Sequence, residues 1–219
     1  VISGPQGTLF GRNAVGGAIS VYTKTPGNEI EAEAKATYGN YNLMEGSGYV
    51  SGPLSDKLSV GVYANYRRRE TFQTITGAAL YDHETKGGVR GKFVFKPSDT
   101  VKFTGSAEYY SIHSTEAGAL RNIQPDATAY FFGATQEIGK YIYSANENQG
   151  SKISTQGYVL RTDIDLSFAD LVSISAYRKL KVFTVNDLDA TNVALLSDYA
   201  NTYSNQLSQE IQLLSRPGS

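Results

Sequence analysis

From residue 29 onward, hydrophobic and polar residues alternate along the chain with a period of two. In the stretch KLSVGVYANYR (57–67), the even positions are apolar and the odd positions are mostly polar. Because successive side chains of a strand point to opposite faces, this pattern predicts strands with one apolar and one polar face. We predict eight strands, at about 29–39, 43–53, 57–69, 86–97, 100–112, 153–168, 170–184 and 203–215.

The predicted strands are long, and their connections differ in length in a regular way. Several strands exceed the five or six residues usual in globular proteins and reach the roughly 9–11 residues that a tilted membrane-spanning strand needs. Tight connections at 53–57, 97–99 and 169–170 alternate with long ones at 70–85, 113–152 and 185–202. In an up-and-down sheet, all long loops then lie at one end, which is typical of outer-membrane barrels.

Aromatic residues lie toward both ends of these strands. Tyrosines lie toward the long loops, at Tyr38, Tyr41, Tyr66, Tyr109, Tyr110 and Tyr177. Phenylalanines lie toward the tight turns, at Phe93, Phe95, Phe103 and Phe168. Membrane barrels carry such girdles at their two interfaces. The core of a soluble sheet is the alternative that this pattern leaves open.

Composition excludes several other classes of protein. No apolar run approaches the roughly 20 residues of a membrane helix. The net charge of −1 gives no electrostatic reason for nucleic-acid binding, and the chain has no cysteine for a disulfide or thiolate metal site. The two histidines, His83 and His113, have no second ligand at a metal spacing and no nucleophile partner. We therefore predict no metal site, no cofactor and no enzymatic activity.

The glycine-rich stretch GPQGTLFGRNAVGG (4–17) is not a nucleotide-binding loop. A P-loop would carry Lys and Ser or Thr after the glycine at position 16, where this chain has Gly17 and Ala18. The residues that follow, AISVYTK, are β-branched and aromatic and have no helical period. Glycines at this density instead favour tight packing of backbone segments.

The segment GPQGTLFGRNAVGGAISVYTKTP closely resembles the end of the plug domain of TonB-dependent outer-membrane receptors. The later motifs YGNYN, SGPLSDKLS and SQEIQL resemble, more weakly, the first part of the barrel of that family. The resemblance implies an all-β chain in which residues 1–28 end a plug domain and residues 29–219 form about eight strands of a 22-stranded transmembrane barrel. Both ends of the chain lack start or stop features, so we expect an internal segment of a longer receptor.

The resemblance also implies roles for particular residues. Its glycines would shape the plug, at Gly4, Gly7, Gly11, Gly16 and Gly17. Many family members have a basic residue before the Gly-Pro pair, where this chain has Ser3; an ion pair from that position to the barrel wall is therefore in doubt. Arg12 is the remaining plug cation nearby, and it either pairs with the wall or is solvated.

The predicted inward faces carry charges: Glu31, Glu33, Lys35, Arg90, Lys92, Arg161, Asp163 and Asp165. Eight strands close around an interior just wide enough for side chains, so these charges and a plug need a wider barrel. Arg68, at the end of the third predicted strand, falls on the outward face, where it either meets lipid phosphates or is simply solvated.

The function implied is energy-coupled uptake of a scarce nutrient across the outer membrane of a Gram-negative bacterium. The cargo favoured is a metal–siderophore complex, with a cobalamin-like molecule or an oligosaccharide as other candidates. The partners expected are a TonB-type protein acting through a segment before Val1, outer-membrane lipid and the transported ligand. The alternative is a passive barrel or an adhesin-like structural β-protein without energy coupling.

The predicted long loop 113–152 holds two aromatic clusters, AYFFG (129–133) and KYIYS (140–144). Aromatic rings on an external loop offer stacking surface for a ligand. We list Tyr130, Phe131, Phe132, Tyr141 and Tyr143 as candidate ligand-binding residues. Packing of these rings on one another, to hold the loop together, is the alternative.

Overall fold

The computed structural model describes the chain at residues 2–3, 17–18, 21–72, 74–76, 83–114, 131–134, 141–147, 149–189 and 191–215. Within these ranges the chain is all-β, and no helix is long and apolar enough to cross a membrane.

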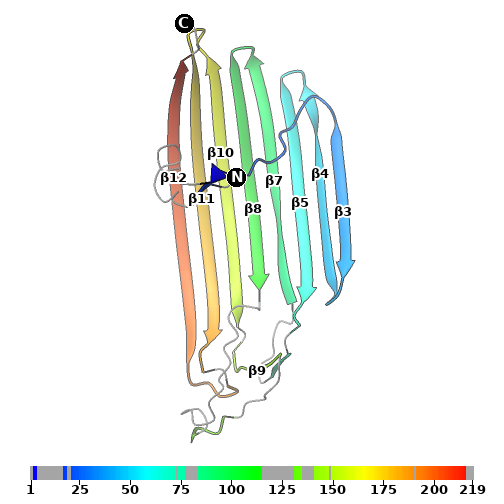
Figure 1. The fold of residues 1–219 in the computed structure, drawn as a ribbon, viewed down its shortest axis with the longest axis vertical. Helices are drawn as coiled ribbons and strands as arrows, with labels where there is room; N and C mark the ends of the chain where they lie inside the picture. The colour runs from blue at the N-terminus through cyan, green and yellow to red at the C-terminus, as the bar shows by residue number, and fades with distance from the viewer. Residues whose placement is uncertain are drawn as a thin grey trace.

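Eight long strands form one antiparallel sheet in simple up-and-down order (Figure 1). They are β3 (Glu31–Gly39), β4 (Leu43–Ser55), β5 (Leu58–Glu70), β7 (His83–Ser98), β8 (Val101–Ser114), β10 (Gly150–Asp165), β11 (Ala169–Asp187) and β12 (Ser197–Ser215). Each strand pairs with the next long strand in sequence, so β3 and β12 are the two edges. The predicted eight-stranded meander with two free edges is confirmed.

Two smaller sheets lie outside this meander. Strands β1 (Ile2–Ser3) and β2 (Gly17–Ala18) pair antiparallel, and the partner of Gly17 is Ser3. Strands β6 (Thr74–Thr76) and β9 (Ile142–Ser144) pair in parallel and join two of the long connections. The parallel pair was not predicted, because two three-residue strands so far apart in sequence leave no periodic signal.

From β4 onward the tight turns lie at one end of the sheet and the long connections at the other, as predicted, while the short β3–β4 turn lies at the end of the long connections (Figure 1). The turn predicted at 169–170 is wrong by a few residues, because β10 ends at Asp165 and β11 already begins at Ala169. The Asp165 carboxylate accepts a hydrogen bond of 2.8 Å from the Ser167 backbone N–H, and Ser167 has a left-handed φ of 67°. This side-chain-to-backbone bond closes the turn earlier than the alternation suggested.

At the long-loop end, several strands extend further than predicted. Strand β12 begins at Ser197 rather than near residue 203, and β11 continues to Asp187 rather than to 184. The added residues continue the antiparallel ladder, with Asn186 opposite Asp198. The predictions stopped short because polar residues occur on both faces here, so the few apolar residues, such as Val185 and Tyr199, do not form a regular alternation.

Register assigns every side chain to one of two faces. One row across all eight strands, on the outer face, reads Ala32, Val50, Val62, Gly91, Ala107, Tyr158, Tyr177 and Leu207. The adjacent row, on the inner face, reads Glu33, Tyr49, Tyr63, Arg90, Glu108, Gly157, Arg178 and Gln206. The predicted separation of apolar and polar faces is confirmed along these rows.

One patch of the outer face departs from this rule. Gln209 of β12 accepts a hydrogen bond of 2.5 Å from Ser175 and donates one of 2.9 Å to Ser173. All three residues lie on the outer face of β11 and β12. Because these polar groups hydrogen bond with one another, they can lie on an apolar face at a lower cost than unpaired groups would.

Aromatic residues frame an apolar band on the outer face. Tyr66, Tyr109, Tyr158 and Tyr177 form its border toward the long connections, and the rings of Tyr158 and Tyr177 stack with centroids 6.3 Å apart. Phe95 and Phe103 stack at the same centroid distance near the tight turns. From Leu58 to Tyr66, β5 runs about 26 Å along the strand at ~3.3 Å per residue, and a tilt of about 40° turns this into about 20 Å of height, comparable with the ~25 Å apolar band of membrane barrels. Of the predicted tyrosines, Tyr110 faces inward and Tyr41 lies in the turn before β4.

Candidate functional site

The segment before the first long strand crosses the inner face of the sheet and forms the best-defined site (Figure 1). Pro26 is buried there. It lies against Gly61, where a Cβ would stand 3.1 Å from Pro26 Cγ and 3.0 Å from Ser51 Cβ. The neighbouring inner-face residues Ser51, Ser59 and Val94 are 4%, 6% and 8% exposed. A side chain at position 61 would therefore press on Pro26 and Ser51, and the crossing segment would have to shift to make room.

Lys92 of β7 holds this segment from the side. Its Nζ donates a hydrogen bond of 2.7 Å to Thr25 Oγ1. The same ammonium lies 3.3 Å from the carbonyl oxygen of Lys24 and 3.4 Å from that of Thr23. One cation thus satisfies three oxygens on consecutive residues, which fixes the path of the backbone at 23–25.

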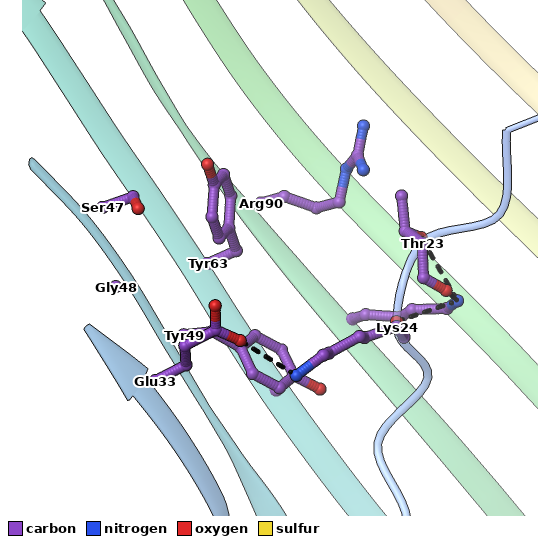
Figure 2. A pocket seen from close by; sticks show the side chains of 10 residues that line it. Thr23, Lys24, Glu33, Ser47, Gly48, Tyr49, Tyr63 and Arg90 are labelled. Atoms are coloured by element: carbon purple, nitrogen blue, oxygen red, sulfur yellow. Dashed lines mark hydrogen bonds and ion pairs between the residues drawn. The ribbon is translucent and has the colours of Figure 1, made fainter. Parts of the chain in front are cut away.

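Lys24 makes the reciprocal contact from the segment to the first strand. Its Nζ lies 3.2 Å from Glu33 Oε2 and 3.6 Å from Glu31 Oε2, and 5.0 Å from the centre of the Tyr49 ring (Figure 2). The hydrogen bond to Glu33 raises the pKa of Lys24, which lies outside the strands. Because these groups are solvent-exposed, the pairs position the segment more than they stabilise the fold.

Between the segment and the wall lies a cavity of about 340 Å³. The residues that give it chemical character are Lys24, Glu33, Tyr49, Tyr63, Arg90 and Lys92. Figure 2 shows the Tyr49 ring beside the Lys24 side chain, with Tyr63 and Arg90 further from it on the neighbouring strands. The Tyr49 hydroxyl is buried and has no hydrogen-bond partner within the described part of the chain. Three cations and one carboxylate line the cavity, and each cation has a partner: Lys24 pairs with Glu33, Arg90 with Glu108, and Lys92 bonds oxygens of residues 23–25.

Other charges of the inner face pair with one another. Arg90 Nε donates a hydrogen bond of 2.8 Å to Glu108 Oε2, and its Nη2 contacts the same oxygen. Further toward the tight turns, Asp163 accepts a hydrogen bond of 2.6 Å from Arg161 and lies 3.8 Å from Lys102. Asp163 and Asp165, which share a strand face, have separate partners and do not form a carboxylate pair. Of the inward charges predicted from the sequence, the structure thus places these in ion pairs: Glu31, Glu33, Arg90, Arg161 and Asp163.

Among the predicted ligand-binding aromatics, the structure describes the side chains of Phe131, Phe132 and Tyr141, and these have separate ring partners. Phe131 and Phe132 are 88% and 57% exposed, and their rings contact each other edge to face at 5.5 Å. Tyr141 instead contacts Phe72 at 5.5 Å, and Phe72 lies 6.2 Å from Tyr41. Tyr143 belongs to β9, and Tyr130 lies outside the described residues. Their role in ligand binding stays a prediction.

Most of the plug residues lie outside the described part of the chain, namely Gly4, Gly7, Gly11, Arg12 and Gly16. Gly17 is described, in β2 opposite Ser3. The sequence reasoning missed the contacts of Lys24 and Thr25 with Lys92 and Glu33. The sequence signal for these contacts was the polar stretch TKTP directly before the alternating region. Polar residues at this place could have predicted contacts with polar groups of the sheet.

The described residues contain no group of three or more His, Asp or Glu side chains able to hold a metal ion.

Comparison with known proteins bears on the fold. No family model matches the chain. Along 76 residues it is 33% identical to the iron-regulated outer membrane virulence protein of Vibrio cholerae, a match that covers 32% of this chain and 12% of that protein. The siderophore receptor PiuA of Acinetobacter baumannii superposes on 99% of the chain with a TM-score of 0.75 and 16% identity. The ferric yersiniabactin uptake receptor FyuA of Yersinia pestis covers 99% with a TM-score of 0.74 and 17% identity.

The fold is that of TonB-dependent outer-membrane receptors. The ferric-catecholate import receptor Fiu of E. coli K12 agrees, with a TM-score of 0.69 over 97% of the chain at 16% identity. The chain spans about a third of the length of these solved receptors, at 32%, 33% and 35%. The predicted receptor resemblance, the all-β barrel-wall fold and the location in the outer membrane are confirmed. These structural matches are receptors rather than enzymes.

Proposed function

We propose that this chain is part of a receptor that takes up a metal–siderophore complex across the outer membrane with energy from a TonB-type partner. Residues 1–28 are the end of the plug in this proposal, and residues 29–219 are the first part of the barrel wall. The observation that carries it is the crossing segment 21–30, held on the inner face by Lys92, Lys24 and Pro26. A passive pore has no need of such a fixed attachment inside its wall.

The attachment explains how energy coupling can work mechanically. A partner that pulls on residues before the crossing segment needs the wall to hold the end of the plug in place. Lys92 bonds three consecutive residues just before β3, so a pull upstream acts on the plug and not on the first strand. Fixed ends of this kind let a force change one part of a fold while the barrel keeps its shape.

The donors that line the cavity suit a cargo with negatively charged hydrogen-bond acceptors, which would compete with Glu33 and Glu108 for the cations. Lys24, Arg90 and Lys92 face the cavity together with the hydroxyls of Tyr49 and Tyr63. Metal chelates whose ligating groups are carboxylates or catecholates carry negative charge, and cations with hydroxyl donors bind such groups through charge-assisted hydrogen bonds. The structural match to a ferric-catecholate import receptor supports this class of cargo.

The test is uptake of radioactively labelled ligands by cells in which the gene of the full-length receptor is deleted and then restored. A panel of ferric siderophores, cobalamin and an oligosaccharide identifies the cargo. We expect uptake of at least one ferric siderophore that stops when the proton gradient is collapsed with a protonophore. Uptake that persists without the gradient would support the passive barrel, and no siderophore uptake by the restored strain would reject the proposed cargo.

A further inference from the structure

The outer face changes character beyond the tyrosine border, toward the long connections. The register places these residues outward there: Ser111 and His113 of β8, Lys152, Ser154 and Gln156 of β10, Lys179, Lys181 and Phe183 of β11, and Asn201, Tyr203 and Asn205 of β12. This set contains three lysines and no carboxylate. Glu147, which hydrogen bonds with Tyr199, lies further out at the loop end of β12.

Two of the lysines line a common hollow of about 210 Å³. Its polar lining consists of Ser111, Lys152, Ser154, Lys181, Asn201 and Tyr203, which we call the basic groove. Lys181 lies opposite Ser154, and Lys152 opposite Phe183, so the two lysines are diagonal neighbours on one face. Diagonal neighbours stand about 7–8 Å apart at the backbone, close enough for two long side chains to reach one small anion.

The position of the groove determines which anion it meets. Lys179 and Lys181 follow Tyr177 by two and four residues on the same face, which is about 7–13 Å along the strand at ~3.3 Å per residue, or about 5–10 Å in height at a tilt near 40°. Lipid headgroups lie at this height, just outside the apolar band. At the opposite ends of the same strands the outward positions are apolar, with Leu171 and Leu213 paired across β11 and β12. The outward lysines of these strands therefore lie only on the long-loop side.

We propose that the basic groove binds a phosphate group on a lipid of the outer leaflet. The two ammonium groups and the hydroxyls of Ser111, Ser154 and Tyr203 supply donors to the phosphate oxygens. The stacked rings of Tyr158 and Tyr177 below the groove supply apolar surface for the rest of the lipid. A free anion would use the donors but not the aromatic surface, so the site favours a lipid-borne phosphate over inorganic phosphate.

The experiment uses the full-length receptor in neutral detergent and diphosphorylated lipid A as the probe, with retention measured by native mass spectrometry. Removing both lysines (Lys152→Gln with Lys181→Gln) should weaken retention about 10- to 30-fold, given the worth of two cations near a charged lipid surface. The matched control removes two cations from the inner face (Lys35→Gln with Arg178→Gln) and should leave retention unchanged. The conservative variant Lys152→Arg with Lys181→Arg should retain the lipid.

Two further arms identify the source of the anion. Lipid A stripped of its phosphates should be retained as weakly by the native receptor as intact lipid A is by the double glutamine variant. Inorganic phosphate at millimolar concentration should not displace the lipid. The proposal is overturned if the double glutamine variant, shown to be folded by its heat-modified gel mobility, retains lipid A like the native receptor. Equal retention of dephosphorylated lipid, or displacement by inorganic phosphate, overturns it as well.

Discussion

The two faces of the sheet are built from the same strands, yet one face is apolar and the other is charged. The outer face between the aromatic borders presents Val50, Val62 and Leu207 and almost no charge. The inner face one residue away presents Glu33, Arg90 and Glu108, whose charges are paired. The difference teaches that the strand period of two, and not overall hydrophobicity, adapts this chain to a membrane.

The largest effect should come from placing a charge on the outer face. Val62 lies midway between Leu58 and Tyr66 on β5, near the centre of the apolar band. Val62→Arg should destabilise the folded full-length receptor by about 2–4 kcal/mol, the cost of a cation at the bilayer midplane. The measurement is urea-induced unfolding in lipid vesicles.

The matched control for that substitution lies on the inner face of the same strand. Asn65→Arg faces polar neighbours and should change the free energy of unfolding by less than about 1 kcal/mol. Ser59, although it also faces inward, is a poor control because only 6% of it is exposed. Equal costs for the arginines at positions 62 and 65 would contradict the assignment of faces.

A smaller effect is expected where the inner face holds the crossing segment. Lys92→Met removes the ammonium that bonds Thr25 and the carbonyls of residues 23 and 24. Losing one charge-assisted hydrogen bond should cost about 1–2 kcal/mol locally. Hydrogen exchange of the amides at 21–30 should accelerate about 5- to 30-fold, while the strands keep their protection.

The control is Lys35→Met, which removes an inner-face lysine that has no ion pair among the described residues. Exchange at 21–30 should not respond to it. If both variants leave this segment equally protected, the Lys92 contacts do not hold it.

A still smaller effect should follow from adding one methyl group under Pro26. The Cβ of Gly61→Ala would stand 3.0 Å from Ser51 Cβ and 3.1 Å from Pro26 Cγ, so the segment must shift. We expect a loss of about 1 kcal/mol in stability of the local packing. Gly91→Ala is the control on the outer face, because its Cβ meets no atom within 4 Å. Proteolysis within residues 21–30 should increase for the first variant only.

The smallest expected effect is the response of the Lys24 contact to pH. Because its hydrogen bond to Glu33 raises the pKa of Lys24 above the usual 10.5, the contact contributes fully below that pH and is lost as the pH rises past the raised value. Exchange at 21–30, corrected for its intrinsic pH dependence, should stay constant from pH 7 to 9 and increase above about 10.5. Lys24→Gln should remove that increase; a step that survives in this variant would assign it to another group.

Most of the fold could be predicted from the sequence where a strand faces lipid on one side and polar groups on the other. Between the borders marked by Phe95 and Tyr66, these two surroundings impose the alternation of apolar and polar residues from which the strands were predicted. Beyond Lys181 the strands have left the apolar band, so residues 197–202 pair in the ladder without a regular alternation. Pairing of β6 with β9 joins segments that are far apart in sequence, which a local pattern cannot encode.

The candidate site was predictable only in its parts. The inward charges Glu33 and Lys92 were assigned to the correct face from their spacing. Their partner, the crossing segment at 23–26, was not identified, because its contacts depend on how the chain returns across β5 and β7. Gly61, read as one small residue in an alternating strand, turned out to be the place where Pro26 packs.

The most direct test of the central claim is a cysteine scan of β5 in the full-length receptor, since this chain has no cysteine of its own. Spin labels placed one at a time at positions 58–66 report collisions with oxygen, which concentrates in lipid, and with a water-soluble nickel complex. If the sheet is the wall of an outer-membrane barrel, labels at 60, 62 and 64 collide with oxygen and those at 63 and 65 with the nickel complex. Equal accessibility of odd and even positions to the nickel complex would contradict the account.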